Sequence, residues 1–286
     1  MIINTYNESS LHKTLKNLYS LNEGDQTEIQ QDGHIYDILS KDGTVIEIQT
    51  ANLSKLYPKI SDAISKNHKC IIVHPIIVKK NILLLNKNGE KISFRKSPKT
   101  ESIYSLFREL TAIYPLLLDK KVTLKIPLIS MTEIRIKTDR SVQTANKKRR
   151  FKKDWIKTDK KLEEIHKTVT LNSYKDYLSL LPETLPETFT SLDLKNELKK
   201  INTLPASAVN MANIMIWVLC KMELIVKTGT KNKFFTYKIN KKYSNQKQYG
   251  TFENSLSVLF MISSTPRVVS MSIKNTFEPE NVPFLP

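Results

Sequence analysis

An Asp-Gly pair at residues 42–43, set between two runs of alternating apolar and polar residues, is the feature that most constrains this chain. Asp-Gly is a strong signal for a two-residue hairpin turn, because both central residues of that turn adopt positive φ. Residues 35–40 and 45–50 are therefore predicted to pair as antiparallel strands. A two-residue turn places Asp37 beside Ile48 and within one residue of Glu47.

The predicted hairpin brings the carboxylates of Asp37 and Glu47 to one place. Glu47 and Gln49 share one face of their strand, and Ile46 and Ile48 point to the opposite face, where we expect core. Two neighbouring carboxylates repel and lose solvation, so a cation commonly neutralises such a pair. The alternative is that both acids lie on a solvated face, where polar residues recur at every second position.

Asp37, the Glu47-x-Gln49 triplet and a following helix with lysines resemble the core motif of the PD-(D/E)XK nuclease superfamily. In that motif an acidic residue enters a hairpin, and a second acidic residue is followed two positions later by Lys. Gln49 stands where the lysine usually is, as in the Gln variants found among restriction endonucleases. The resemblance covers the first half of the chain. It implies a mixed α/β sheet flanked by helices and hydrolysis of DNA that depends on Mg²⁺ or Mn²⁺.

The resemblance also implies roles for five residues. Asp37 and Glu47 would hold the metal together with Glu8 from the first helix, Gln49 would orient the attacking water, and Lys59 would supply the missing positive charge. Each role has a simpler alternative: a glutamate at a helix N-terminus complements the helix dipole, and lysines on a helix face are usually solvated.

Hydrophobic periodicity predicts the other elements of the first half. We expect helices at 8–20 (N-cap Asn7), 52–66 and 102–118, and strands at 26–30, 69–77, 81–86, 91–96 and 122–137, with tight turns at Asp32-Gly33 and Asn88-Gly89. Pro58 is predicted to kink its helix or to start it anew. His12 and His74 are predicted to be a helix-surface residue and a structural histidine, respectively.

A basic stretch marks a predicted domain boundary. Residues 147–161 contain nine Lys or Arg and two Asp, interleaved with Phe151 and Trp155. Such a stretch is usually a solvated linker, and it also suits contact with a nucleic-acid backbone through Lys148, Arg149 and Arg150. We therefore divide the chain into a nuclease-like domain at 1–140, a basic linker at 141–161, a second domain at 162–245 and a tail at 246–286.

The second domain is predicted to be mainly helical. Helices are expected at 162–169, 174–181, 191–200 and 206–221, with a capping box at Thr190 and strands at 223–227 and 234–239 around Gly229. This order resembles a winged helix-turn-helix, with Lys227, Lys231 and Lys233 in the wing as DNA-binding groups. The fourth helix is apolar on most sides, so protein contact or formation of a homodimer is the alternative role.

Composition favours DNA as the partner, because the formal net charge of +17 suits an anionic ligand. Of the 45 basic residues 38 are Lys, which an AT-rich coding sequence could also produce. Cys70 and Cys220 lack metal-ligand spacing and are expected as free thiols of a cytoplasmic protein. Polar residues interrupt the most apolar stretch, 209–226, which disfavours a membrane span. We expect a metal-dependent DNA endonuclease; a catalytically inactive DNA-binding regulator or a protein-interaction module is the alternative.

Overall fold

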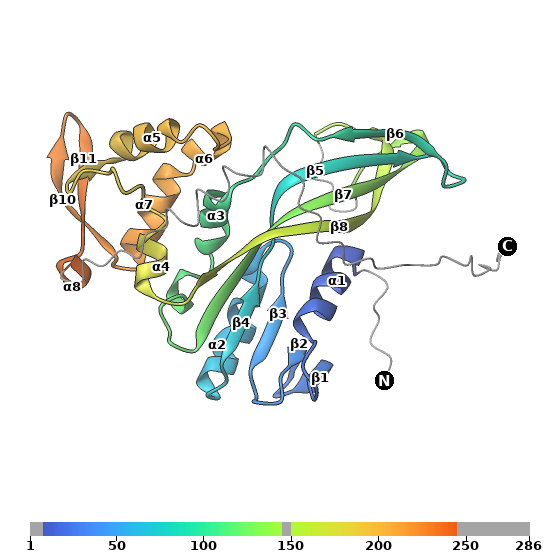
Figure 1. Cartoon of the computed structure of the whole chain (residues 1–286), viewed down its shortest axis with the longest axis horizontal. Coiled ribbons are helices and arrows are strands. Elements are labelled where there is room, and N and C mark those ends of the chain that lie inside the picture. Colours follow the sequence, from blue (N-terminus) through green and yellow to red (C-terminus); the bar gives the residue numbers. More distant parts are fainter. Residues whose placement is uncertain (1–7, 145–149, 245–286) are drawn as a thin grey trace. The chain divides into compact units, whose positions relative to one another are not determined.

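The computed structural model describes residues 8–144 and 150–244, and these form a mixed α/β fold with a large mixed sheet and flanking helices (Figure 1). The strands of this sheet are β1 (Gln26–Gln31), β2 (His34–Leu39), β3 (Val45–Ile48), β4 (Cys70–Val73), β5 (Ile76–Leu85), β6 (Lys91–Lys96), β7 (Val122–Val142) and β8 (Lys153–Leu171). Their order is β1-β2-β3-β4-β7-β5-β6, and β8 pairs with β7. The coarse α/β prediction is confirmed.

The first three strands form the predicted antiparallel meander. Asp32 and Gly33 both have positive φ, as a two-residue turn between β1 and β2 requires. The β2–β3 turn is one residue longer than predicted, because Ser40 N–H donates to the Thr44 carbonyl at 2.9 Å and only Gly43 has positive φ. Ile38 therefore pairs with Ile46, and the register is shifted by one residue from the prediction. Continuing this register places Asp37 directly opposite Glu47.

The apolar run at 69–77 forms two strands instead of the single predicted strand. β4 ends at Val73 and β5 begins at Ile76, with His74 and Pro75 between them. Both strands run parallel to β7, β4 along residues 122–125 and β5 along residues 128–136. The run is thus one interrupted path beside β7, and β4 lies centrally between β3 and β7, as expected for the strand after the crossover helix.

Two predictions are wrong: residues 153–161 are not a linker, and residues 162–169 are not a helix. Residues 153–171 are the single strand β8, which pairs antiparallel with β7 from Leu171 opposite Leu124 to Lys153 opposite Val142. A free edge of β7 offers a row of backbone donors and acceptors, and pairing with it outweighs the helix preference of residues 162–166. Strand β8 therefore continues the large sheet across the boundary we predicted.

The helices of the first half are shorter than the hydrophobic pattern indicated. Helix α1 (Ser10–Tyr19) begins after Ser9, whose side chain accepts from the His12 N–H; the predicted cap, Asn7, lies outside the described residues. A 3-10 turn η1 (Leu53–Leu56) precedes α2 (Tyr57–Ser65), where Pro58 occupies the first turn. The predicted helix at 102–118 is three pieces: η2 (Ile103–Ser105), α3 (Leu106–Leu110) and η3 (Tyr114–Leu116).

The described C-terminal part forms a second, three-stranded sheet with helices. Its elements are α4 (Tyr174–Leu178), β9 (Phe189–Thr190), α5 (Ser191–Lys200), α6 (Ala206–Val209), α7 (Ala212–Lys221), β10 (Ile225–Lys231), β11 (Phe234–Ile239) and α8 (Lys241–Ser244), with sheet order β10-β11-β9. The capping box at Thr190 and Asp193 is confirmed. The β10–β11 turn lies at Asn232 and Lys233, whose φ angles are positive, and Gly229 lies at a bulge instead. The predicted tail lies outside the described residues.

No helix within the described residues is both long and apolar enough to cross a membrane.

The core under α1 positions the acidic residues of β2 and β3. Leu11 and Leu15 are fully buried against Ile38, Ile46 and Ile48, so α1 covers the face that the sequence predicted as core. Burying a leucine side chain contributes about 1.5–3 kcal/mol. This packing positions α1 so that His12 and Lys16 reach acidic side chains beside the sheet.

Replacing Leu15 with Ala is expected to lower the free energy of unfolding by about 2–5 kcal/mol, because it leaves a cavity between α1 and the sheet. Leu18→Ala on the same helix is the matched control, since Leu18 is 44% exposed and its truncation is expected to cost less than about 0.5 kcal/mol. Urea unfolding followed by circular dichroism measures both. Equal losses in the two variants would contradict the described packing of α1.

Candidate functional site

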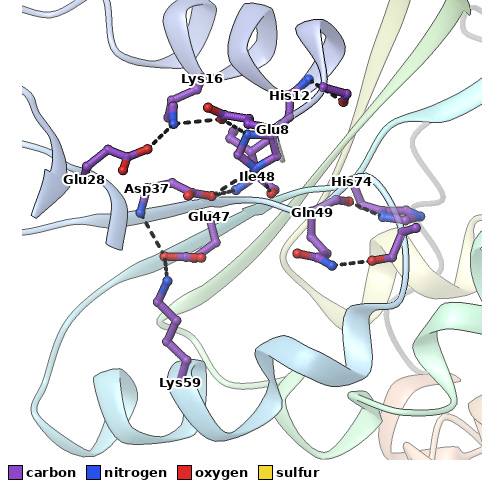
Figure 2. Close-up of polar contacts among 12 residues, drawn as sticks. Glu8, His12, Lys16, Glu28, Asp37, Glu47, Ile48, Gln49, Lys59 and His74 are labelled. Atoms are coloured by element: carbon purple, nitrogen blue, oxygen red, sulfur yellow. Dashed lines mark hydrogen bonds and ion pairs between the residues drawn. The ribbon is translucent and has the colours of Figure 1, made fainter. Parts of the chain in front are cut away.

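Elements α1, β2, β3 and α2 meet around Asp37 (Figure 2). Seven charged side chains gather there, and we call them the Asp37 cluster: Glu8, His12, Lys16, Glu28, Asp37, Glu47 and Lys59. Helices α1 and α2 lie on opposite sides of β3 in this view, so the cluster extends through the plane of the sheet.

The sheet is interrupted at Asp37. The β1–β2 ladder pairs Thr27 with Ile38 and Ile29 with Tyr36 but omits Glu28 and Asp37. Glu28 has a φ of 57°, a conformation that non-glycine residues rarely adopt and that is found at strained or functional positions.

Side chains replace two backbone hydrogen bonds that are missing around Asp37. The Ile48 N–H donates to Asp37 Oδ2 at 2.8 Å, and the Asp37 N–H donates to Glu47 Oε1 at 3.2 Å. Each carboxylate thereby satisfies a backbone donor that a regular ladder would have paired with a carbonyl. The two acids therefore have a structural role in joining β2 to β3.

On the α1 side, three residues spaced four apart form a chain of charge contacts. His12 Nδ1 contacts Glu8 Oε1, and His12 Nε2 lies 2.7 Å from the Ile48 carbonyl and 3.6 Å from Asp37 Oδ2. Lys16 Nζ lies 2.8 Å from Glu8 Oε1 and 2.5 Å from Glu28 Oε1. The predicted helix-surface histidine is thus a partly buried bridge between α1 and the β3 backbone.

On the α2 side, Lys59 contacts Glu47, one of the two arrangements that the sequence analysis left open. Its Nζ lies 2.5 Å from Glu47 Oε1 and 5.2 Å from the centre of the Tyr36 ring. Glu47 is only 3% exposed, so the solvated-face alternative is wrong for this residue. A buried carboxylate needs such a partner, because an unpaired charge in the interior is strongly destabilising.

Gln49 directly follows β3, and its side chain has no described contact with the carboxylates. Its side-chain amide donates to the Ala51 carbonyl, and its own backbone carbonyl lies 2.7 Å from His74 Nδ1 (Figure 2). His74 is buried and is thus a satisfied structural histidine, as predicted. Two histidines, His12 and His74, fix consecutive carbonyls where β3 ends.

The surroundings of Asp37 and Glu47 shift the pKa values of these two acids in opposite directions. Burial and the neighbouring Asp37 charge outweigh Lys59 and raise the pKa of Glu47 to about 7. Burial also raises the pKa of Asp37, but His12 and the Ile48 N–H outweigh it and hold that pKa below its ordinary value. Burial lowers the pKa of His12, and the Asp37 and Glu8 carboxylates more than offset this, so the net shift is upward. Groups with separated pKa values suit acid–base chemistry.

The described arrangement does not fit the predicted Mg²⁺ or Mn²⁺ site. Magnesium binds through carboxylate oxygens and water, so the oxygens must face an open point together. Here the Glu47 carboxylate is directed to Lys59 of α2, whereas the Asp37 carboxylate is directed to Ile48 and His12, and Glu8 is bonded to α1 (Figure 2). Among the described residues no group of three His, Cys, Asp or Glu is placed to hold a metal ion.

A Ser-His-Glu arrangement on β7 and β8 is a separate cluster. Ser130 Oγ lies 2.6 Å from His166 Nε2, and His166 Nδ1 lies 3.2 Å from Glu164 Oε1, the connectivity of a catalytic triad. However, Ser130 lies in mid-strand, where β7 is paired with β5 on one edge and β8 on the other. Backbone N–H groups that are already paired cannot stabilise an oxyanion, so we interpret the cluster as a cross-strand link.

The predicted DNA-binding residues that the structure describes lie in two places. Lys148 and Arg149 lie outside the described residues, and Arg150 precedes β8 with its guanidinium carbon 5.1 Å from the centre of the Phe151 ring. In the β10–β11 hairpin, Lys227 Nζ lies 3.2 Å from the centre of the Phe235 ring. Lys231 and Lys233 are exposed at the end of that hairpin.

Sequence reasoning missed Lys16 and Glu28. The spacing of Glu8, His12 and Lys16 is the signal that could have revealed Lys16, because residues four apart share one face of a helix. No comparable signal marks Glu28, which lies on a different element from Lys16 and whose backbone has a positive φ.

Comparison with known proteins identifies relatives of this chain. A family model described as "Domain of unknown function (DUF8091)" matches residues 9–172, which include the Asp37 cluster except Glu8. A protein of Treponema pallidum (strain Nichols), named "Uncharacterized protein", is 31% identical over 194 residues, covering 68% of this chain and 74% of that protein. No solved structure matches the chain.

Glu47→Gln is expected to change how stability depends on pH. Because the folded-state pKa of Glu47 is raised from 4.5 to about 7, its contribution is fully present below pH 4.5 and is lost as pH rises through 7. The variant lacks this titration, so the wild type should lose on the order of a few kcal/mol relative to it between pH 4.5 and 8. Urea unfolding at several pH values measures the difference, and Glu163→Gln at an exposed position is the control. Parallel pH profiles would contradict the raised pKa.

Proposed function

We propose that this chain, which belongs to the DUF8091 family, is a DNA-binding protein whose β10–β11 hairpin contacts the sugar–phosphate backbone. One observation carries the proposal: residues 225–239 contain four lysines and no acidic residue, and they expose two adjacent phenylalanines at the turn. Phe234 is 43% exposed and Phe235 is 51% exposed. Exposed cations beside aromatic rings suit a nucleic acid, which offers phosphates and flat bases.

The order of the surrounding elements supports the same proposal. Helix α4, strand β9, helices α5 and α6–α7 and the β10–β11 hairpin follow one another in the order of a winged helix, in which the hairpin is the wing. The helix before the hairpin is poorly suited to reading bases, because Met215 and Leu219 are buried and Trp217 packs edge-on against Tyr114 at 5.6 Å. We therefore propose backbone contact with little dependence on base sequence.

The ion pairs of the Asp37 cluster favour binding over hydrolysis in the described arrangement. Lys59 neutralises Glu47, and Lys16 neutralises Glu8 and Glu28. A divalent cation would need the same oxygens. This supports the proposal that the N-terminal part of the chain takes part in DNA binding without cleaving DNA.

Hydrolysis of DNA is a second candidate function, and a specific observation favours it. The Asp37 N–H donates to the Glu47 carboxylate, so the two acids are neighbours. Their pKa values nevertheless shift in opposite directions: that of Glu47 is raised and that of Asp37 is lowered. Such separation is common in sites that exchange protons near neutral pH. The sheet interruption at Asp37 and the positive φ of Glu28 are further features that cluster at functional sites.

Replacing Lys231 and Lys233 with Ala is expected to weaken DNA binding and to reduce its salt dependence. Each lost phosphate contact should lower the slope of log K against log salt concentration by about 0.9 on duplex DNA. Fluorescence anisotropy of a labelled duplex between low and moderate KCl concentrations measures the slope. Lys69→Ala with Lys120→Ala, which removes two exposed lysines elsewhere, is the control. Equal slopes for both double variants would assign DNA contact to another surface and favour a protein-interaction role for the C-terminal part.

Plasmid cleavage tests the second candidate. If the Asp37 cluster hydrolyses DNA, purified protein should nick plasmid DNA with added Mg²⁺ or Mn²⁺, stop in chelator, and lose activity in Asp37→Ala. Lys59→Ala should slow cleavage by about 10²–10³, the effect of removing a group that stabilises developing charge. Asp154→Ala, at an exposed position, is the control. DNA binding without metal-dependent cleavage of duplex, single-stranded or branched DNA would leave binding as the function.

A further inference from the structure

We infer that a cationic cluster on β5, β7 and β8 is a binding site for one phosphate group of a nucleic-acid backbone. This Glu133 cluster consists of Lys80, Glu133, Arg135, Lys157 and Lys160. The inference deepens the proposed DNA binding, on which it rests, by assigning a second contact site on the large sheet, apart from the β10–β11 hairpin.

Three of the cations surround one buried carboxylate. Glu133 is 1% exposed, and its oxygens receive Arg135 Nε at 2.7 Å, Lys157 Nζ at 2.9 Å and Lys80 Nζ at 3.5 Å. This is more positive charge than one carboxylate neutralises. Desolvation raises the pKa of Glu133, but the cations outweigh it and bring the value to about 2.

Lys160 adds a fourth positive charge to the same place. It lies opposite Glu133 in the β7–β8 register and has no carboxylate within ion-pair distance among the residues that the structure describes. Burial is the largest cause that lowers the pKa of Lys160, and the charges of Lys157 and Lys80 lower it further, whereas Glu133 and Glu101 offset part of the shift. Like charges held together repel, so an added anion would stabilise this arrangement. A structural ion pair alone would not require the fourth cation.

The cluster presents its cations in a form that suits phosphate. The Arg135 guanidinium stacks on the Trp155 ring at 3.7 Å, which fixes its plane, and the Lys157 side chain is 50% exposed, so an anion can approach from solvent. A guanidinium and lysine ammonium groups donate several hydrogen bonds at once, and a phosphate has enough oxygens to accept them.

The Glu133 cluster is linked to the first turn of α1. Asp159, the neighbour of Lys160, accepts from the Ser10 N–H at 2.9 Å and from the Ser10 hydroxyl. The same helix carries His12 of the Asp37 cluster. The strand that carries Lys157 and Lys160 is thereby tied to the first turn of α1.

The test replaces Lys157 and Lys160 with Gln and compares DNA binding with that of the control Lys69→Gln with Lys120→Gln, which removes equal charge at exposed positions far along the sheet. Glu133 keeps Arg135 and Lys80 in the test variant, and thermal unfolding monitors its folding. For one phosphate, the slope of log K against log salt concentration should fall by about 0.9 in the test variant and remain unchanged in the control. An equal slope in the wild type and both variants overturns the site.

A second measurement separates the site from the proposed function. In a Trp217→Phe background Trp155 is the remaining tryptophan, and inorganic phosphate added at constant ionic strength should change its emission unless Lys157 and Lys160 are replaced. Such a change in protein that binds no DNA would support a phosphate site and overturn the DNA function. DNA binding with an unchanged slope and no response of Trp155 would overturn the site alone. No DNA binding and no response would overturn both.

Discussion

Two carboxylates, the buried Glu47 and the partly buried Asp37, take the place of regular backbone pairing around Asp37, and the join between β2 and β3 depends on this exchange. Asp37 accepts the Ile48 N–H and Glu47 accepts the Asp37 N–H, so each acid is fixed by the other's strand. Because a buried charge is tolerated only when it is paired, the exchange also requires His12 and Lys59 to approach from α1 and α2. The irregular pairing at Asp37 is thus accompanied by a polar partner from each helix, His12 from α1 and Lys59 from α2.

Helix α1 has two roles, and a different face of the helix carries out each one. Its apolar face, Leu11 and Leu15, packs on the sheet, and its polar face holds His12 and Lys16 over the acids. Its first turn is tied to β8 through Asp159. The helix therefore contacts both the strands that carry the Asp37 cluster and the strand that carries Lys157 and Lys160.

Local signals in the sequence were reliable where neighbouring residues decide the structure. The Asp32-Gly33 turn, the capping box at Thr190 and the restart of a helix at Pro58 follow from backbone preferences that neighbours cannot easily override. The hairpin at Gly43 was predicted correctly in kind, but its turn is one residue longer, and this change alone moves Asp37 opposite Glu47. The error was greatest at residues 153–171, because their charge pattern suits a solvated linker or helix while the free edge of β7 decides their pairing.

The sequence by itself determined that acids at 37 and 47 would meet on a hairpin and that Ile46 and Ile48 would face the core, whereas for Lys59 it left a solvated position open as the alternative to contact with the acids. These results depend on the two-residue period of a strand and on short sequence separations. Only the tertiary structure decided that the two carboxylates bond to backbone N–H groups and to different helices, and that Glu28 and Lys16 join them. The physical reason is that side-chain direction and desolvation depend on contacts between distant segments, which periodicity does not encode.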